Sequence, residues 1–139
     1  MPLTASRIRL TDEGATLLVE AAAAKARAMG QPQCIAVVDE GCNLLAYLRM
    51  DGAKLLSRES AIRKAMTAAS GRVPTGQLAE GLDARLALAT DGRVTNLQGG
   101  LPIVLHGQVV GGIGIGSGTG AQDAEVAEAA LAALVRAAG

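Results

Sequence analysis

Residues 111–123 read GGIGIGSGTGAQD, a glycine-alternating strand that leads into the start of a helix. In an extended strand Gly112, Gly114 and Gly116 lie on one face and the two isoleucines between them on the other, so one face carries no side chains. Because glycine weakens a strand, this pattern indicates that a helix, a neighbouring chain or a flat ligand approaches closely. The loop that follows enters an alanine-rich helix whose first turn offers unpaired N–H groups, and this predicts a binding site. The alternative is that these glycines serve only packing and the helix start.

The known glycine fingerprints for nucleotides do not fit this stretch. A dinucleotide motif needs G-x-G-x-x-G or Ala in the last place, and only Gly116, Gly118 and Ala121 match even the looser form. A Walker loop needs Gly-Lys-Ser/Thr, which does not occur. The pattern therefore disfavours nucleotide binding.

Length and composition are typical of one small domain, and we expect residues 1–139 to form it. The chain has no Phe, no Trp and one Tyr, so the core must be built from Ala, Val, Leu, Ile and Met. Small residues on helix faces allow close packing between elements. We expect the chain to assemble with copies of itself, as a dimer or a higher homo-oligomer.

Charge excludes several partners. Thirteen basic and thirteen acidic residues cancel, and no basic stripe or aromatic platform suited to nucleic acid is visible. No uninterrupted apolar stretch reaches about 18 residues, and the N-terminus lacks the apolar core of a signal peptide. We therefore expect a soluble cytoplasmic protein with neither nucleic acid nor membrane as partner. Cys34 and Cys42 lack C-x-x-C spacing, so neither zinc nor a disulfide scaffold is indicated.

Hydrophobic periodicity and turn residues predict the order of elements. Thr11 caps a first helix that ends at Gly30, and Ser57 caps a later helix that Gly71 closes. The remaining expected elements are a hairpin over 34–38 and 44–48, a short helix from Pro74 to about Leu86, a loop with one short strand over 90–100, a hairpin over 101–105 and 108–115, and a last helix after the glycine-rich loop. Such an order is typical of a mostly antiparallel sheet covered by helices.

Three segments carry a resemblance to a known family. They are 35–53, IAVVDEGCNLLAYLRMDGA; 57–75, SRESAIRKAMTAASGRVPT; and 98–134, QGGLPIVLHGQVVGGIGIGSGTGAQDAEVAEAALAAL. Together they resemble the GlcG/HbpS family, which includes the C-terminal domain of PduO-type proteins. The resemblance implies an α/β (α+β) profilin-like sandwich, with a mostly antiparallel five-stranded sheet, helices on both faces and assembly into oligomers. Some relatives bind haem, so the resemblance also implies haem as the expected cofactor.

The iron ligand for such a haem stays open at this point. His106 is the only histidine and lies in the tight turn of LHGQV, where a side chain is usually solvated. The other donors are Tyr47, Met50, Met66, Cys34, Cys42 and the weak oxygen donor Thr119. No residue among them is singled out.

Basic residues near the glycine-rich loop indicate a site for an anion. If the second helix turns Lys64 toward the loop, cationic groups and free N–H donors converge as a carboxylate requires. The predicted cofactor-binding residues are Arg49, Lys64, Thr67, Arg72, Thr75, Gly116, Ser117, Gly118 and Thr119. The alternative is that the basic residues are ordinary surface charges.

Two functions follow from these residues. The first is a small-ligand-binding protein for haem or a related carboxylate-bearing molecule. The alternative is a cofactor-independent isomerase, lyase or hydrolase acting on a small oxygenated organic acid, with Asp39 or Asp123 as the catalytic base. A single turn histidine leaves no plausible Ser-His-Asp or Cys-His arrangement.

Overall fold

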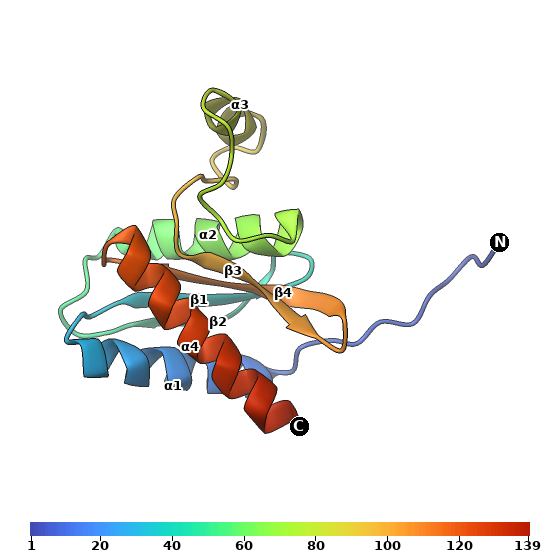
Figure 1. Cartoon of the computed structure of the whole chain (residues 1–139). Helices are drawn as coiled ribbons and strands as arrows, with labels where there is room; N and C mark the ends of the chain where they lie inside the picture. The colour runs from blue at the N-terminus through green and yellow to red at the C-terminus, as the bar shows by residue number, and fades with distance from the viewer.

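The computed structural model describes residues 1–139 and contains four helices and four strands (Figure 1). In chain order these are α1 (Asp12–Met29), β1 (Cys34–Asp39), β2 (Leu44–Arg49), α2 (Ser57–Gly71), α3 (Leu82–Ala89), β3 (Gly100–Leu105), β4 (Gln108–Gly116) and α4 (Gly120–Ala138). The sheet has the order β2-β1-β4-β3, and every neighbouring pair is antiparallel. Helix α2 covers one face, and α1 and α4 cover the other. This confirms the expected mixed α/β architecture with an antiparallel sheet.

Local signals place the ends of α1 as the sequence predicts, whereas the expected cap of α2 is wrong. Leu56 is the N-cap residue of α2, Ser57 lies inside the helix without a side-chain cap bond, and Arg72 instead of Gly71 adopts the left-handed conformation at its end. The Thr11 side chain accepts a hydrogen bond from the Gly14 N–H, and Gly30 ends α1 with a φ of 68°. At α4 the Thr119 and Gln122 side chains and backbone form a reciprocal capping box. Some N–H groups in the first turn of α4 are therefore already hydrogen-bonded within the protein and are not free for a ligand.

The core is aliphatic and lies in two layers. The larger one fills the space between α1, α4 and the sheet, with Leu18, Ile35, Ile113 and Val126 fully buried. The smaller one, between α2 and β1, consists largely of alanines together with Cys34 and Val38. Small residues there let α2 lie very close to the sheet.

The side-chain-free face of β4 contacts α2, which is the first of the three approaches that the sequence left open. A Cβ built on Gly114 would overlap the Ala61 carbonyl oxygen and lie 2.5 Å from Ala65 N. One built on Gly112 would overlap the Ala65 carbonyl oxygen. The glycines therefore permit contact between helix backbone and strand backbone, and α2 fills the space that a flat ligand would need at Gly112 and Gly114.

Two expectations about the middle of the chain are wrong. The sheet has four strands, not five, because residues 90–99 form a loop before β3 whose backbone bonds the Thr67 side chain instead of a neighbouring strand. The third helix begins at Leu82, not Pro74, because Thr75 is paired with Gly100 and Gly81 turns the chain at a φ of 89°. Residues 76–98, here called the arm, stand away from the body with α3 at the tip (Figure 1).

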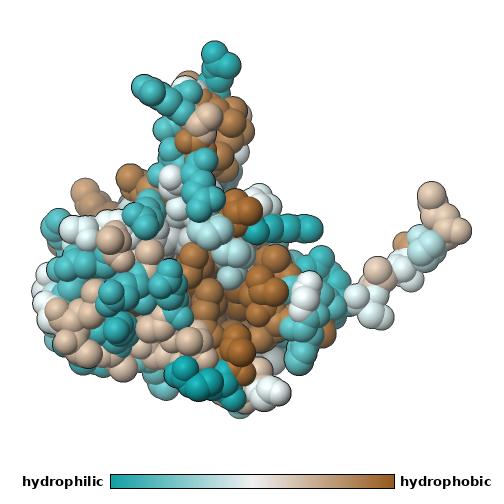
Figure 2. Space-filling view, viewed as in Figure 1, coloured by the Kyte–Doolittle hydropathy of each residue, from teal (hydrophilic) through white to brown (hydrophobic).

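The arm carries apolar surface. Leu88 is 84% exposed and Leu82 44% exposed, and no residue of α3 is buried. Figure 2 shows brown, apolar atoms on the projecting arm. None of the helices combines the length and the apolar character that crossing a bilayer demands. Assembly into a homo-oligomer and the single-domain organisation stay predictions.

Candidate functional site

The glycine loop, Ser117–Thr119, joins the end of β4 to the start of α4 and is strained. Ser117 has a φ of 101°, a region that residues with a side chain rarely occupy. The Lys54 N–H donates to the Ser117 hydroxyl at 3.0 Å, and the Gln31 amide donates to the Ser117 carbonyl at 3.3 Å. Two separate segments therefore hold the loop in this conformation.

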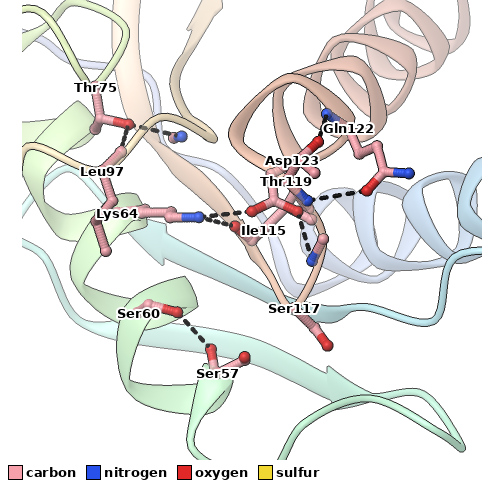
Figure 3. A network of polar contacts seen from close by, with 12 residues as sticks. Ser57, Ser60, Lys64, Thr75, Leu97, Ile115, Ser117, Thr119, Gln122 and Asp123 are labelled. Atoms are coloured by element: carbon pink, nitrogen blue, oxygen red, sulfur yellow. Dashed lines mark hydrogen bonds and ion pairs between the residues drawn. The ribbon is translucent and has the colours of Figure 1, made fainter.

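Lys64 and Asp123 form a buried ion pair beside the glycine loop (Figure 3). The Lys64 ammonium lies 2.8 Å from Asp123 Oδ2 and donates to the Ile115 carbonyl at 2.7 Å. The other Asp123 oxygen accepts a hydrogen bond from the Gly118 N–H at 3.1 Å. Only 5% of the lysine side chain and 2% of the aspartate side chain are exposed, so each charge depends on the other for compensation.

A small polar pocket, here called the glycine-loop pocket, opens at this ion pair with a volume of about 220 Å³. It is lined by Lys54, Ser57, Ser60, Lys64, Leu97, Gln98, Ser117, Gly118, Gly120 and Asp123. Helix α2 supplies both serines and the buried lysine because Ser57, Ser60 and Lys64 follow helical spacing on one side. Lys54 makes no ion pair.

Beneath the glycine loop lies an unsatisfied side chain. Gln33 is fully buried, and neither its amide nitrogen nor its amide oxygen has a hydrogen-bond partner. A Cβ at Gly118 would stand 2.9 Å from the Gln33 nitrogen and 2.8 Å from Asp123 Oδ1. Buried amides without partners are rare in folded proteins, so this one marks the loop as more than a helix cap.

A second, larger hollow lies at the other end of α2, where the arm meets the body. This arm hollow has a volume of about 470 Å³ and a mostly apolar wall. It is lined by Thr67, Ser70, Gly71, Val73, Pro74, Thr75, Gly76, Gln77, Leu78, Leu86, Thr90, Val94 and Thr95. Arg72 stands exposed between two of these residues, with a φ of 62°.

Two of the predicted binding threonines have structural bonds inside this region. The Thr67 hydroxyl donates to the Arg93 carbonyl and accepts from the Thr95 N–H. The Thr75 hydroxyl donates to the Leu97 carbonyl and accepts from the Gly100 N–H. These bonds fasten the arm to the body and fix the shape of the arm hollow.

The structure thus divides the predicted constellation between separate places. Lys64, Asp123 and the stretch Gly116–Thr119 come together, whereas Arg72 lies about 12 Å further along α2, at ~1.5 Å per residue. Thr67 and Thr75 line the arm hollow with Arg72 beside them. Arg49 is exposed at the end of β2, where it lines a third hollow with Met50.

Asp39 lies far from the glycine loop. In the register of β1 with β4, Cys34 pairs with Gly116 and Asp39 with Gly111, a separation of about 17 Å at ~3.3 Å per residue. The Asp39 carboxylate accepts hydrogen bonds from the Gly41 N–H and from the backbone and side chain of Asn43. Its contacts are those of a residue that organises the β1–β2 turn.

No thiol or phenol group of the chain lines either pocket, although the Cys34 thiol donates to the carbonyl of the pocket residue Lys54 at 3.5 Å. Burial, with a smaller contribution from Asp39, raises the pKa of the Cys42 thiol. Burial, together with a hydrogen bond to Cys34, raises the pKa of Tyr47 to about 12. His106 is exposed in the β3–β4 turn with a φ of 50°.

Sequence reasoning missed Lys54 and Ser57 of the glycine-loop pocket, and it missed Gln33, which lies next to the loop without lining the pocket. The alignment of Ser60 with Lys64 on one side of the second helix was the available signal for the α2 wall. Gln33 precedes a strand as an ordinary polar residue, and only the folded structure reveals its burial.

Comparison with known proteins identifies relatives over most of the chain. A family described as "Haem degrading protein HbpS-like" matches residues 10–132. The "Uncharacterized 15.0 kDa protein in dhaT-dhaS intergenic region" of Citrobacter freundii is 35% identical over 127 residues, which are 88% of this chain and 89% of that protein. The crystal structure of HbpS is 39% identical, with a TM-score of 0.82 and coverage of 94% and 93%. The crystal structure of a PduOC:heme complex is 29% identical, with a TM-score of 0.83 and coverage of 91% and 95%.

Proposed function

The chain belongs to the HbpS-like family, and from this membership we propose that it binds haem, or a related planar molecule with carboxylate groups, in the arm hollow. The name of the family and the haem complex of PduOC support a haem-related ligand. The apolar wall of the arm hollow, which includes no charged residue, carries the choice of site, since another hollow of about 500 Å³ has Glu59, Arg63 and Asp83 in its lining.

Size separates the two pockets as sites for a macrocycle. Sites for drug-sized ligands have volumes of about 300–1,000 Å³ and predominantly apolar walls. The arm hollow, at about 470 Å³, lies within that range, and Val73, Leu78, Leu86 and Val94 supply apolar contacts. The glycine-loop pocket, at about 220 Å³, is too small and too polar for the ring.

The residues of the arm hollow fit the organic part of haem better than its iron. Arg72 lies in sequence between the lining residues Gly71 and Val73, and its exposed side chain is available to pair with a propionate. Haem iron is usually held by His, Cys, Met or Tyr, and none of these residue types lines the hollow. We therefore propose that this chain binds the ring and its carboxylates, and we assign it no chemical step at the iron.

The alternative, an enzyme for a small oxygenated acid, would use the glycine-loop pocket, since Asp123 lies there. Both oxygens of Asp123 are already engaged, one by the Gly118 N–H and the other by Lys64. A general base needs to reach the proton that it removes, and this carboxylate is instead held against two donors of its own fold. The geometry therefore favours binding over catalysis.

Titration with hemin, and in parallel with metal-free protoporphyrin, tests the proposal. We expect a saturable shift of the Soret band with one equivalent of either ring, because the hollow recognises the ring. Ser70→Trp, on the exposed last turn of α2, should fill the hollow and lower the affinity for both rings about tenfold or more. Glu20→Trp, on an exposed position of α1, is the matched control and should bind like the wild type.

Two results would refute this assignment. Unsaturable hemin uptake would show that the protein has no defined ring site. Saturable uptake that Ser70→Trp leaves unchanged, while circular dichroism shows the variant folded, would place the ring elsewhere.

A further inference from the structure

The glycine-loop pocket has the features of a second binding site, separate from the proposed haem site in the arm hollow. We infer that it binds a short-chain monocarboxylate, such as a two- to four-carbon acid, independently of the arm hollow. The inference rests on the charge at the pocket, on donors left free there, on an orphaned buried amide and on the volume.

Charge at the pocket favours a single negative charge. Lys54 and Lys64 contribute two positive charges and Asp123 one negative charge, so the lining carries a net charge of +1. The N-terminal end of α4, with Gly120 on the wall, adds a partial positive charge. The second negative charge of a dianion would have no counterpart in the lining and would be repelled by Asp123. A monocarboxylate matches the net charge of the lining.

Donors remain free after the protein's own hydrogen bonds are counted. An ammonium group has three N–H donors, and Lys64 uses two of them, on Ile115 and Asp123. The Ser117 hydroxyl accepts from the Lys54 N–H and keeps its own hydrogen, and the Ser57 hydroxyl makes no hydrogen bond. A carboxylate in this pocket therefore meets a buried cation and two hydroxyl donors.

The backbone of the loop contributes as well. The capping box and Asp123 occupy the N–H groups of Gly118, Thr119 and Gln122. The N–H groups of Gly120 and Ala121 make no hydrogen bond. The absence of a Cβ at Gly120 keeps the wall open, because a Cβ there would lie 2.8 Å from the Gln98 amide oxygen.

Gln33 lies outside the pocket lining, next to the loop that forms the pocket wall, and adds an observation independent of the charge and the free donors. Its side chain is fully buried with no partner, and its nitrogen lies against Gly118, on the loop that forms the pocket wall. An unpaired buried amide costs free energy, which a purely structural helix cap would not require. The strained φ of Ser117 occurs in the same loop.

The volume sets the chain length of the acid. At about 220 Å³ the pocket lies below the range for drug-sized ligands, so it admits a few heavy atoms beyond the carboxylate. The exposed side chain of Leu97 forms the one apolar part of the lining. We therefore expect acetate, propionate and butyrate to bind and hexanoate to be disfavoured.

Amide-detected NMR with the full chain tests this inference. Titration with acetate should shift the amide signals of Gly118, Gly120 and Ala121 saturably, with an affinity in the millimolar range typical of so few atoms. Lys54 is exposed and its side chain makes no ion pair, so Lys54→Gln should lower the affinity for acetate about tenfold while the protein stays folded. Lys25→Gln, on α1, removes the same charge at the cost of a partly exposed ion pair with Glu125, and as the control it should leave acetate binding unchanged.

The outcomes separate this site from the haem site. Shifts that never saturate, or equal binding by Lys54→Gln and the wild type, would overturn the inference. Displacement of bound hemin by acetate would overturn the independence of the two sites. Acetate binding that persists when hemin does not bind would instead refute only the proposed haem function.

Discussion

Gly114→Ala tests the contact on which the position of α2 depends. The added methyl group would overlap the Ala61 carbonyl oxygen and stand 2.5 Å from Ala65 N. Both neighbours are backbone atoms of a helix, so no side chain can rotate away and the whole helix must shift. Overpacking of this kind costs typically 1–3 kcal/mol, and rigid neighbours place this case near ~3 kcal/mol.

Part of that cost is offset, because alanine has less conformational freedom than glycine in the unfolded chain. This gain is about 0.4–1 kcal/mol, which leaves a net loss of ~2 kcal/mol or more in the free energy of unfolding. At this chain length the loss corresponds to a fall in melting temperature of about 6–8 °C, at ~3–4 °C per kcal/mol. Urea unfolding and thermal melts followed by circular dichroism measure both quantities.

Gly71→Ala is the matched control for this substitution. Gly71 ends α2 with only Val73 Cγ2 near, at 3.9 Å from the added Cβ. Here we expect unchanged or slightly raised stability, by up to about 1 kcal/mol from helix propensity. If Gly114→Ala melts within about 1 °C of the wild type, the backbone contact is not what holds α2 in place.

Two further predictions concern buried polar groups. Lys64→Met should lower the free energy of unfolding by about 3–5 kcal/mol, because it leaves the Asp123 charge buried without a partner. Adding Asp123→Leu should recover much of this loss, and urea unfolding measures both values. A loss under about 1 kcal/mol for Lys64→Met alone would contradict the buried pair. Burial raises the pKa of Tyr47 from 10.0 to about 12, so the folded state holds the phenolic proton more tightly and its contribution to stability, full below pH 10, is lost as pH rises through about 12. Tyr47 is the only tyrosine and the chain lacks tryptophan, so phenolate absorbance reports its titration directly; a midpoint near 10 in the folded protein would contradict it.

Much of the fold could be predicted because its signals are local. Alternating glycines in β4 predicted a close approach, and caps such as Thr11 and Gly30 predicted the ends of α1. The fifth strand could not be excluded from sequence, since nothing local reveals that the backbone of residues 93–95 bonds the Thr67 side chain. The arm likewise depends on these distant contacts.

The candidate site was only partly predictable for a similar reason. Lys64 and the glycine loop meet because α2 turns Lys64 toward the end of β4, which the sequence analysis could state only as a condition of the anion site. Arg72 was expected beside them, but eight residues of helix carry it to the opposite end of α2. The polar character of Gln33 gave no hint that its amide would be buried without a partner.

The contact of α2 with β4 also bears on communication between the two ends of the helix. The Ala61 and Ala65 carbonyl oxygens occupy the space that a Cβ on Gly114 or Gly112 would fill, so a translation of the helix along its axis would bring them toward the residues of the strand that carry side chains or toward other backbone atoms. Helix α2 is consequently blocked from sliding along its own axis over β4. An occupant at one end cannot signal to the other by moving the helix, and simultaneous occupancy should follow simple, uncoupled binding equilibria.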